Sequence, residues 1–180
     1  MEPNEGYDVV HLKPGEAYFT DRGELVITVL GSCLSVTMFS RRKLAGICHC
    51  LLPECVNRGR CGGECGEGYR YVACSIRRMV AEFERYAVPR EEIEVKCFGG
   101  ADMFARKPGL PEILSVGRQN ILTAEKIIAF EGLRLKAQDV GGLSGRKVLF
   151  YTGTGEILLK RLRGATDRHP LSLENSKDRQ

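Results

Sequence analysis

The hydrophobic and polar positions of this chain follow two patterns, one typical of buried strands and one typical of amphipathic helices. Short apolar runs rich in Val, Ile and Leu predict strands at Leu25–Leu30, Leu34–Phe39, Leu44–Leu52, Ile93–Phe98, Leu133–Val140, Lys147–Tyr151 and Glu156–Leu162. Apolar residues that recur at helical spacing predict helices at Tyr69–Tyr86 and Gly117–Phe130. Strands therefore come first along the chain, and helices and strands are mixed after them.

The turns between these elements indicate how the strands pair. The polar turn Ser40–Lys43 separates two predicted strands and favours a hairpin. The Gly- and Thr-rich turn Thr152–Gly155 predicts a second hairpin. This order of elements favours an α+β domain in which helices cover a sheet or a pair of sheets. We expect a single domain over residues 1–163 and a polar tail over 164–180.

Composition and charge narrow the class of protein. The chain is 43% hydrophobic and 28% charged, which is ordinary for a soluble globular protein. Its net charge of +4 comes from interspersed charges of both signs, so it lacks the concentrated basic stripe of a dedicated nucleic-acid binder. No apolar stretch is long enough to span a membrane, and the acidic N-terminus does not resemble a signal peptide. We therefore expect a cytoplasmic protein whose eight cysteines are free or metal-bound.

A cysteine interrupts the first apolar segment, in the sequence TVLGSCLSV at Thr28–Val36. Cys33 follows Gly31 and Ser32, and a turn of small residues can expose a thiol at a strand end. Backbone N–H groups at such a turn can also point toward a developing oxyanion. Cys33 is therefore a candidate nucleophile, provided that a neighbouring base removes its proton.

The base that the pattern offers is His49, on the strand expected to pair with the strand of Cys33. A third polar group would orient the imidazole, and Thr28 can do so through its hydroxyl or its carbonyl group. The alternative is that Cys33 is a small buried hydrophobic residue and His49 a core histidine with satisfied hydrogen bonds. The residue pattern alone leaves both interpretations open.

A pair of glycines, Gly99 and Gly100, follows the predicted strand Ile93–Phe98. The usual reason for such a pair is a turn that requires positive φ, although it can also let a substrate backbone approach closely. The candidate oxyanion or substrate positions are therefore Gly31, Ser32, Gly99 and Gly100.

Further cysteines lie close together in the sequence and raise a second possibility. Because side chains alternate along a strand, Cys48 and Cys50 point to one face of the sheet and His49 to the other. If the glycine-rich loop that follows folds over that face, five thiols meet: Cys48, Cys50, Cys55, Cys61 and Cys65. Such a cluster could hold a structural zinc or iron, although its spacing is not that of a standard zinc ribbon. The alternative is that these are separate core and loop thiols.

Several segments resemble those of one known family. They are LKPGEAY at Leu12–Tyr18, TVLGSCLSV around Cys33, AGICHCLLP around His49, KCFGGADMF at Lys96–Phe104, VGRQN at Val116–Asn120 and AQDVGGLSGRKVLFYTGTGEI at Ala137–Ile157. They occur in order and cover nearly everything from Leu12 to Leu162. On these motifs the chain resembles CheD, the family of chemoreceptor glutamine deamidases of bacterial and archaeal chemotaxis.

The resemblance implies a hydrolase with Cys33 as nucleophile, His49 as general base and acid, and Thr28 as the orienting residue. The family fold is an α+β arrangement of packed β-sheets flanked by helices, related to a bacterial toxin deamidase. Its substrates are glutamine side chains on the cytoplasmic domain of methyl-accepting chemotaxis receptors, and some members also hydrolyse receptor methyl esters. The family requires no metal or organic cofactor, and the phosphatase CheC is a partner of some members.

Two features depart from the family pattern, namely the extra cysteines and Asp102, where Asn or Ser is more usual. Rival interpretations are a non-catalytic module that binds CheC or receptors, a thiol-rich metal or redox protein, and a cysteine peptidase or transglutaminase-like enzyme. We expect a monomer, because no amphipathic element is left over for an interface.

Overall fold

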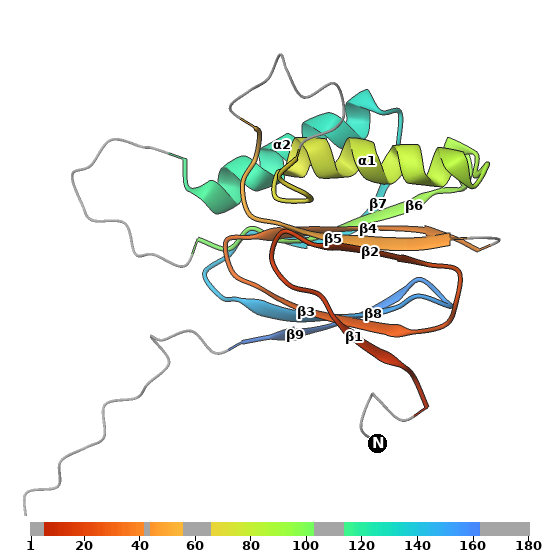
Figure 1. Cartoon of the computed structure of the whole chain (residues 1–180). Helices are drawn as coiled ribbons and strands as arrows, with labels where there is room; N and C mark the ends of the chain where they lie inside the picture. Colours follow the sequence, from red (N-terminus) through yellow and green to blue (C-terminus); the bar gives the residue numbers. More distant parts are fainter. Residues whose placement is uncertain (1–5, 42–43, 56–65, 103–113, 163–180) are drawn as a thin grey trace, which may run out of the picture.

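The computed structural model describes residues 6–41, 44–55, 66–102 and 114–162, which form two β-sheets and two α-helices stacked in three layers (Figure 1). The helical layer contains α1 (Val72–Arg85) and α2 (Val116–Phe130). The middle sheet has the strand order β2-β5-β4-β6-β7, and the outer sheet has the order β1-β3-β8-β9. In chain order the strands are β1 (Val9–His11), β2 (Ala17–Thr20), β3 (Leu25–Leu30), β4 (Leu34–Ser40), β5 (Leu44–Cys50), β6 (Glu94–Gly99), β7 (Leu135–Val140), β8 (Arg146–Tyr151) and β9 (Glu156–Arg161). A short 3₁₀ helix, η1 (Arg90–Glu92), precedes β6.

Both sheets are mixed, and both predicted hairpins are present. Strands β4 and β5 pair antiparallel with Ser35 opposite His49, and β8 pairs antiparallel with β9. Strand β1 runs parallel to β3, and β6 runs parallel to β7. The α+β class expected from the sequence is confirmed, and both helices lie on one face of the middle sheet (Figure 1).

The first apolar segment does not stay in one sheet. Strand β3 belongs to the outer sheet and β4 to the middle sheet, so the chain crosses between the two layers at residues 31–33. The small residues Gly31 and Ser32 permit this sharp change of direction. The crossing places Cys33 where the chain leaves one sheet for the other.

The sequence pattern missed the strands β1 and β2, which contain three and four residues. Runs this short complete too few alternations to show a period of two. Both strands stand at the ends of their sheets, where one side of the strand has no neighbour and an apolar composition is not required.

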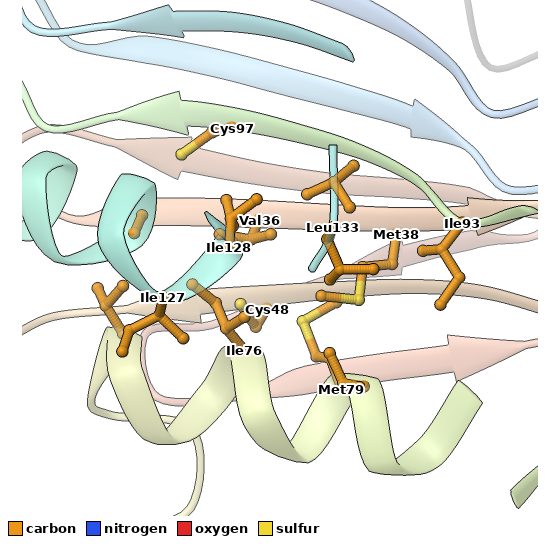
Figure 2. Packing of buried hydrophobic residues seen from close by; sticks show 14 of the residues in the cluster. Val36, Met38, Cys48, Ile76, Met79, Ile93, Cys97, Ile127, Ile128 and Leu133 are labelled. Atoms are coloured by element: carbon orange, nitrogen blue, oxygen red, sulfur yellow. The ribbon is translucent and has the colours of Figure 1, made fainter. Parts of the chain in front are cut away.

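The face of the middle sheet that meets the helices carries the larger core (Figure 2). Val36 of β4 and Cys48 of β5 pack here with Ile76 of α1 and with Ile127 and Ile128 of α2. The apolar residues of α1 share one face because they recur at helical spacing. Burying a side chain of this size contributes roughly 1.5–3 kcal/mol, so these contacts hold the helices on the sheet.

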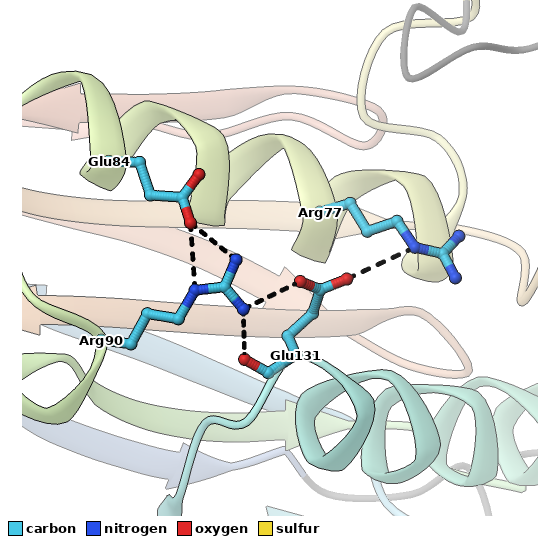
Figure 3. A network of polar contacts seen from close by, with 4 residues as sticks. All are labelled: Arg77, Glu84, Arg90 and Glu131. Carbon is cyan, nitrogen blue, oxygen red and sulfur yellow. Dashed lines mark hydrogen bonds and ion pairs between the residues drawn. The ribbon is translucent and has the colours of Figure 1, made fainter.

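Charged side chains join the ends of the helical layer (Figure 3). Glu131, just after α2, pairs with Arg77 of α1 at 3.5 Å and with Arg90 of η1 at 3.3 Å. Arg90 also pairs with Glu84 of α1 at 2.6 Å. Because the two arginine side chains are about half exposed, water screens these ion pairs and each adds little to stability. The buried apolar contacts therefore account for most of the stability of this layer.

Three expectations concern the chain as a whole. Among the residues that the structure describes, no helix is long and apolar enough to cross a membrane. The polar tail expected over 164–180 lies outside the described residues, as do Cys61 and Cys65. The single domain expected over residues 1–163 stays a prediction.

Candidate active site

His49 lies near the end of β5 with its side chain in the space between the two sheets. Its neighbours Cys48 and Cys50 pack on the opposite face, under the helices, which confirms the alternation predicted from the sequence. The backbone of His49 is held on both sides, because its N–H donates to the carbonyl of Glu16 at 2.9 Å and its carbonyl accepts from the N–H of Gly15 at 2.8 Å. The residue is only 2% exposed, so neighbouring protein groups govern its protonation.

The hydroxyl of Thr28, on β3 of the outer sheet, fixes the imidazole across the gap between the sheets. Its Oγ1 lies 2.8 Å from His49 Nδ1 and 3.0 Å from the carbonyl oxygen of Leu12. A carbonyl oxygen can only accept, so the hydroxyl proton goes to Leu12 and the hydroxyl oxygen accepts from the Nδ1–H of His49. The neutral ring then keeps its lone pair on Nε2, as a general base requires.

Burial keeps both His49 and Cys33 neutral at rest. It lowers the pKa of His49 from 6.5 to about 4, and the carboxylate of Glu16 opposes this effect only in part. Burial likewise raises the pKa of the Cys33 thiol, while the backbone amide of Cys33 itself acts in the opposite direction. At neutral pH the site therefore holds a thiol and a neutral imidazole, and any reaction at sulfur requires a base to remove its proton.

Cys33 lies immediately before β4, two residues from Ser35, the residue paired with His49. Its side chain packs against Leu30 and Phe98 on the inner side of the two sheets. Cys33 and His49 therefore lie on the same face of the middle sheet. Cys33 is partly exposed, whereas the Nε2 of His49 is buried and has no hydrogen-bond partner among the described residues.

Each backbone carbonyl of the turn at residues 31–33 accepts a hydrogen bond. The carbonyl of Gly31 accepts from the N–H of Ala101 at 2.9 Å, and that of Cys33 accepts from the N–H of Gly100 at 2.7 Å. The carbonyl of Ser32 accepts from the side-chain amide of Asn120, on α2, at 3.1 Å. The backbone that carries Cys33 is therefore fixed at each peptide group.

The glycine pair expected near a substrate packs against the chain itself. Gly99 and Gly100 have φ values of +111° and +66°, which confirms the expected turn with positive φ. A Cβ on Gly99 would lie 2.2 Å from the carbonyl oxygen of Cys33. The backbone that approaches Gly99 closely is therefore that of Cys33 and not that of a substrate. The N–H of Gly100 is bonded to the same carbonyl. In this conformation the backbone donor of Gly100 is therefore used by Cys33, and the expectation that Gly100 binds an oxyanion stays a prediction.

A buried arginine anchors this glycine pair. Arg146, the first residue of β8, is fully buried. Its guanidinium donates to the carbonyl of Gly99 at 3.0 Å and to the carbonyl of Gly141, and it pairs with Asp139 at 2.9 Å. A buried charge is stable only with partners of this kind, so the turn and the arginine hold one another in place.

The extra cysteines form no complete metal site in the described part of the chain. The Sγ atoms of Cys48 and Cys50 lie 3.5 Å apart in the helix-facing core, where Cys97 is also buried. Burial raises the pKa of the Cys50 and Cys97 thiols, which disfavours the thiolate form that binds metal. Within residues 6–41, 44–55, 66–102 and 114–162, no group of three or more metal-ligating side chains comes together. Two members of the expected cluster lie outside these ranges, so the five-thiol site stays a prediction.

Comparison with known proteins reveals the family. The family described as "CheD chemotactic sensory transduction" matches residues 51–161. A probable chemoreceptor glutamine deamidase CheD 2 of Geobacter sulfurreducens is 46% identical over 154 residues, which cover 85% of this chain and 89% of that protein. The chain belongs to the CheD family. A probable chemoreceptor glutamine deamidase CheD of Oleidesulfovibrio alaskensis is 43% identical over 166 residues, or 91% of this chain and 77% of the relative.

The match to one of the CheD relatives spans the positions of the candidate catalytic residues. The family match begins after Cys33 and His49, but a match over 91% of the chain necessarily spans both. Among solved structures, that of the hypothetical protein YfiH from Bacillus licheniformis covers 68% of this chain and 49% of its own, with a TM-score of 0.45 and 13% identity. A likeness of that extent carries no argument about activity.

The sequence pattern revealed the three candidate catalytic residues but missed Asn120 and Arg146. Asn120 lies on the buried stripe of α2, one turn after Gly117 and one turn before Ala124. A polar residue on such a stripe is a signal, because buried polar groups are usually kept for their hydrogen bonds. Arg146 gave no such signal, since a basic residue at the start of a strand is usually exposed.

Proposed function

We propose that this CheD-family chain hydrolyses the side-chain amide of glutamine residues in chemoreceptors and so converts them to glutamate. Apart from family membership, one structural observation supports the proposal. The hydroxyl of Thr28 holds His49 with Nε2 as the proton acceptor, on the same sheet face as the partly exposed Cys33. The relatives are named for this reaction.

In the first half of the proposed reaction, His49 Nε2 takes the proton of the Cys33 thiol as sulfur attacks the carbonyl carbon of the glutamine amide. Backbone amides of the turn at residues 31–33 stabilise the oxyanion of the tetrahedral intermediate. The imidazolium then gives its proton to the amide nitrogen, the C–N bond breaks and ammonia leaves. The glutamyl group remains on Cys33 as a thioester.

Water completes the proposed reaction. Neutral His49 removes a proton from a water molecule that attacks the thioester carbon, and the sulfur of Cys33 takes this proton as it leaves. The product is a glutamate side chain, which carries one more negative charge than the glutamine. The low pKa of His49 suits the step in which the imidazolium returns its proton. The reaction needs no metal or organic cofactor.

The resemblance to CheD supports several finer parts of the proposal. We propose that the two packed sheets and their helices form the cysteine hydrolase fold related to a toxin deamidase. The same thiol suits receptor glutamate methyl esters, because an alcohol can leave from the same kind of intermediate. We further propose that the protein acts as a cytoplasmic monomer on the cytoplasmic domain of the receptors, and that a CheC phosphatase is a partner.

The test is to incubate the protein with the cytoplasmic domain of a cognate receptor and to follow peptide masses. Each deamidated glutamine gains about one dalton, because an acid replaces an amide. Cys33→Ala should abolish the gain, whereas Cys74→Ala should keep it, since Cys74 is another partly exposed cysteine but lies on α1. No gain with wild-type protein on any cognate receptor would overturn the proposal, and full activity of Cys33→Ala would overturn the assignment of the nucleophile.

A further inference from the structure

Asn120 joins the two chain segments that carry the candidate nucleophile and base. It is fully buried on α2. Its Nδ2 donates to the carbonyl of Ser32 and to the carbonyl of Leu51, both at 3.1 Å. The first carbonyl precedes Cys33, and the second follows the strand of His49. The Oδ1 of Asn120 is buried without a hydrogen-bond partner among the described residues, which is costly, so packing alone does not account for an asparagine here.

The bond to Ser32 also determines the direction of the next N–H group. The carbonyl of Ser32 and the N–H of Cys33 belong to one planar trans peptide and point to opposite sides of the chain. Asn120 lies on α2, so it draws the carbonyl toward that helix, and the N–H of Cys33 then points away from it. The side chain of Cys33 packs on that same side, against Leu30 and Val148.

The amide and the thiol of Cys33 belong to one residue, and the amide acts to lower the pKa of that thiol, which burial raises. An amide on the same side as the thiol can also stabilise the oxyanion that forms on the carbon bonded to the sulfur.

We propose that Asn120 is a positioning residue that aims the Cys33 amide at the oxyanion of the deamidation reaction. The other two carbonyl groups of the turn are held by backbone donors, the N–H groups of Ala101 and Gly100. Asn120 therefore supplies the side-chain contact that fixes the middle peptide group. The inference rests on the proposed function and adds a residue that acts without touching the substrate.

Asn120→Leu tests this role, because leucine keeps the branching at Cγ and removes the donors. Loss of a whole oxyanion donor lowers kcat by about 10²–10³-fold. We expect a misdirected donor to cost about 10- to 100-fold in kcat for receptor deamidation, with KM unchanged. Alkylation of Cys33 by iodoacetamide, measured at a pH high enough to ionise the thiol fully, should keep its wild-type rate, because displacement at a saturated carbon forms no oxyanion.

A peptide aldehyde in place of the target glutamine gives an equilibrium readout. It adds to the Cys33 thiol as a hemithioacetal, whose oxygen occupies the oxyanion position, so its affinity should fall by the same factor as kcat. Gln119→Ala is the matched control on the same helix. The carboxamide of Gln119 also donates to a backbone carbonyl, that of Leu114 at 2.7 Å, but outside the turn. This variant should keep wild-type values throughout.

Two results would overturn the inference. Wild-type kcat in Asn120→Leu would show that the turn needs no side-chain donor, and parallel losses of deamidation and alkylation would show that Asn120 only supports the fold. If Asn120→Leu does not fold, Asn120→Asp, which has the same shape, is measured in the same way. Failure of the proposed function would look different, because wild-type protein would then deamidate nothing, and the aldehyde measurement would still test the positioning role.

Discussion

At the scale of single residues, the candidate site depends on which atoms can donate a proton. The carbonyl of Leu12 can only accept, and this property gives the Thr28 hydroxyl a fixed direction. The hydroxyl in turn fixes the tautomer of His49. These hydrogen bonds, which begin at a backbone carbonyl, therefore leave the lone pair on Nε2, the nitrogen that we propose acts as the base.

Thr28→Val should remove the hydrogen bonds that Thr28 makes to Leu12 and His49, while it preserves the shape of the buried side chain. Without the hydroxyl, the Nδ1–H of His49 loses its partner, and the ring can shift its proton to Nε2, where it no longer acts as a base. We expect kcat for deamidation to fall by about 10²–10⁴-fold, the usual contribution of a general base. Thr28→Ser, which keeps the hydroxyl, should retain most of the activity. Steady-state kinetics with the receptor domain measure both variants. Equal activity of Thr28→Val and Thr28→Ser would contradict this role of Thr28.

At the scale of elements, the N-terminal turn of α2 docks against the backbone that follows β6. A Cβ on Gly117 would lie 2.6 Å from the carbonyl oxygen of Gly100. Neither position has room for a side chain, because a Cβ on Gly100 would also lie 2.6 Å from Ile121. This close contact brings Asn120, one turn further along the helix, within reach of the turn at residues 31–33.

Gly117→Ala should therefore destabilise the protein, although alanine is the better helix former by about 1 kcal/mol. The clash is with backbone, which cannot rotate away, so we expect a net loss of about 1–3 kcal/mol in the free energy of unfolding. Urea denaturation measures this loss. Gly66→Ala is the control, because a Cβ on Gly66 meets nothing within 4 Å. If Gly117→Ala is as stable as the wild type, α2 can move away from the backbone of Gly100 without a loss of free energy of unfolding.

At the scale of the whole molecule, the two sheets meet through apolar side chains and through the polar contact between Thr28 and His49. Val26 and Phe150 of the outer sheet pack against Ile47 of the middle sheet in this layer. His49 is buried in the same layer and neutral, with a pKa of about 4. Protonation of His49 would place a charge between the sheets, so the packing of the layers is coupled to pH.

Acid should weaken the fold through His49. Its pKa in the folded protein is about 4, below the ordinary value of 6.5, so the unfolded chain binds the proton more readily. The contribution of neutral His49 is complete above pH 6.5 and is lost as the pH falls through about 4. The shift corresponds to about 3 kcal/mol at neutral pH.

Urea denaturation of wild-type protein and of His49→Gln, at a series of pH values, measures this contribution. The carboxylates titrate in both proteins and cancel in the comparison. The difference in unfolding free energy between the two should change by about 3 kcal/mol between neutral pH and about pH 4, to the disadvantage of the wild type in acid. A difference that does not depend on pH would show that His49 is not held neutral by the fold.

The sequence by itself determined features that depend on a residue's near neighbours. The opposite orientations of His49 and Cys48 follow from the pleat of a single strand, and the helices follow from the spacing of their apolar residues. The hairpin of β4 and β5 follows from the polar turn between them. Together with the motifs, these local rules were enough to select Cys33, His49 and Thr28 as candidates.

Only the tertiary structure decided how distant segments meet. The crossing at residues 31–33 puts β3 and β4 in different sheets, and this is why the hydroxyl of Thr28 faces His49 rather than a neighbour on its own strand. Asn120 and Arg146 hold the turns around Cys33 from a helix and a strand much later in the chain. Such contacts depend on how the three layers stack, and no short stretch of sequence encodes this stacking. The packing of distant segments determines which partners a buried polar group has, and the spacing of its sequence neighbours does not.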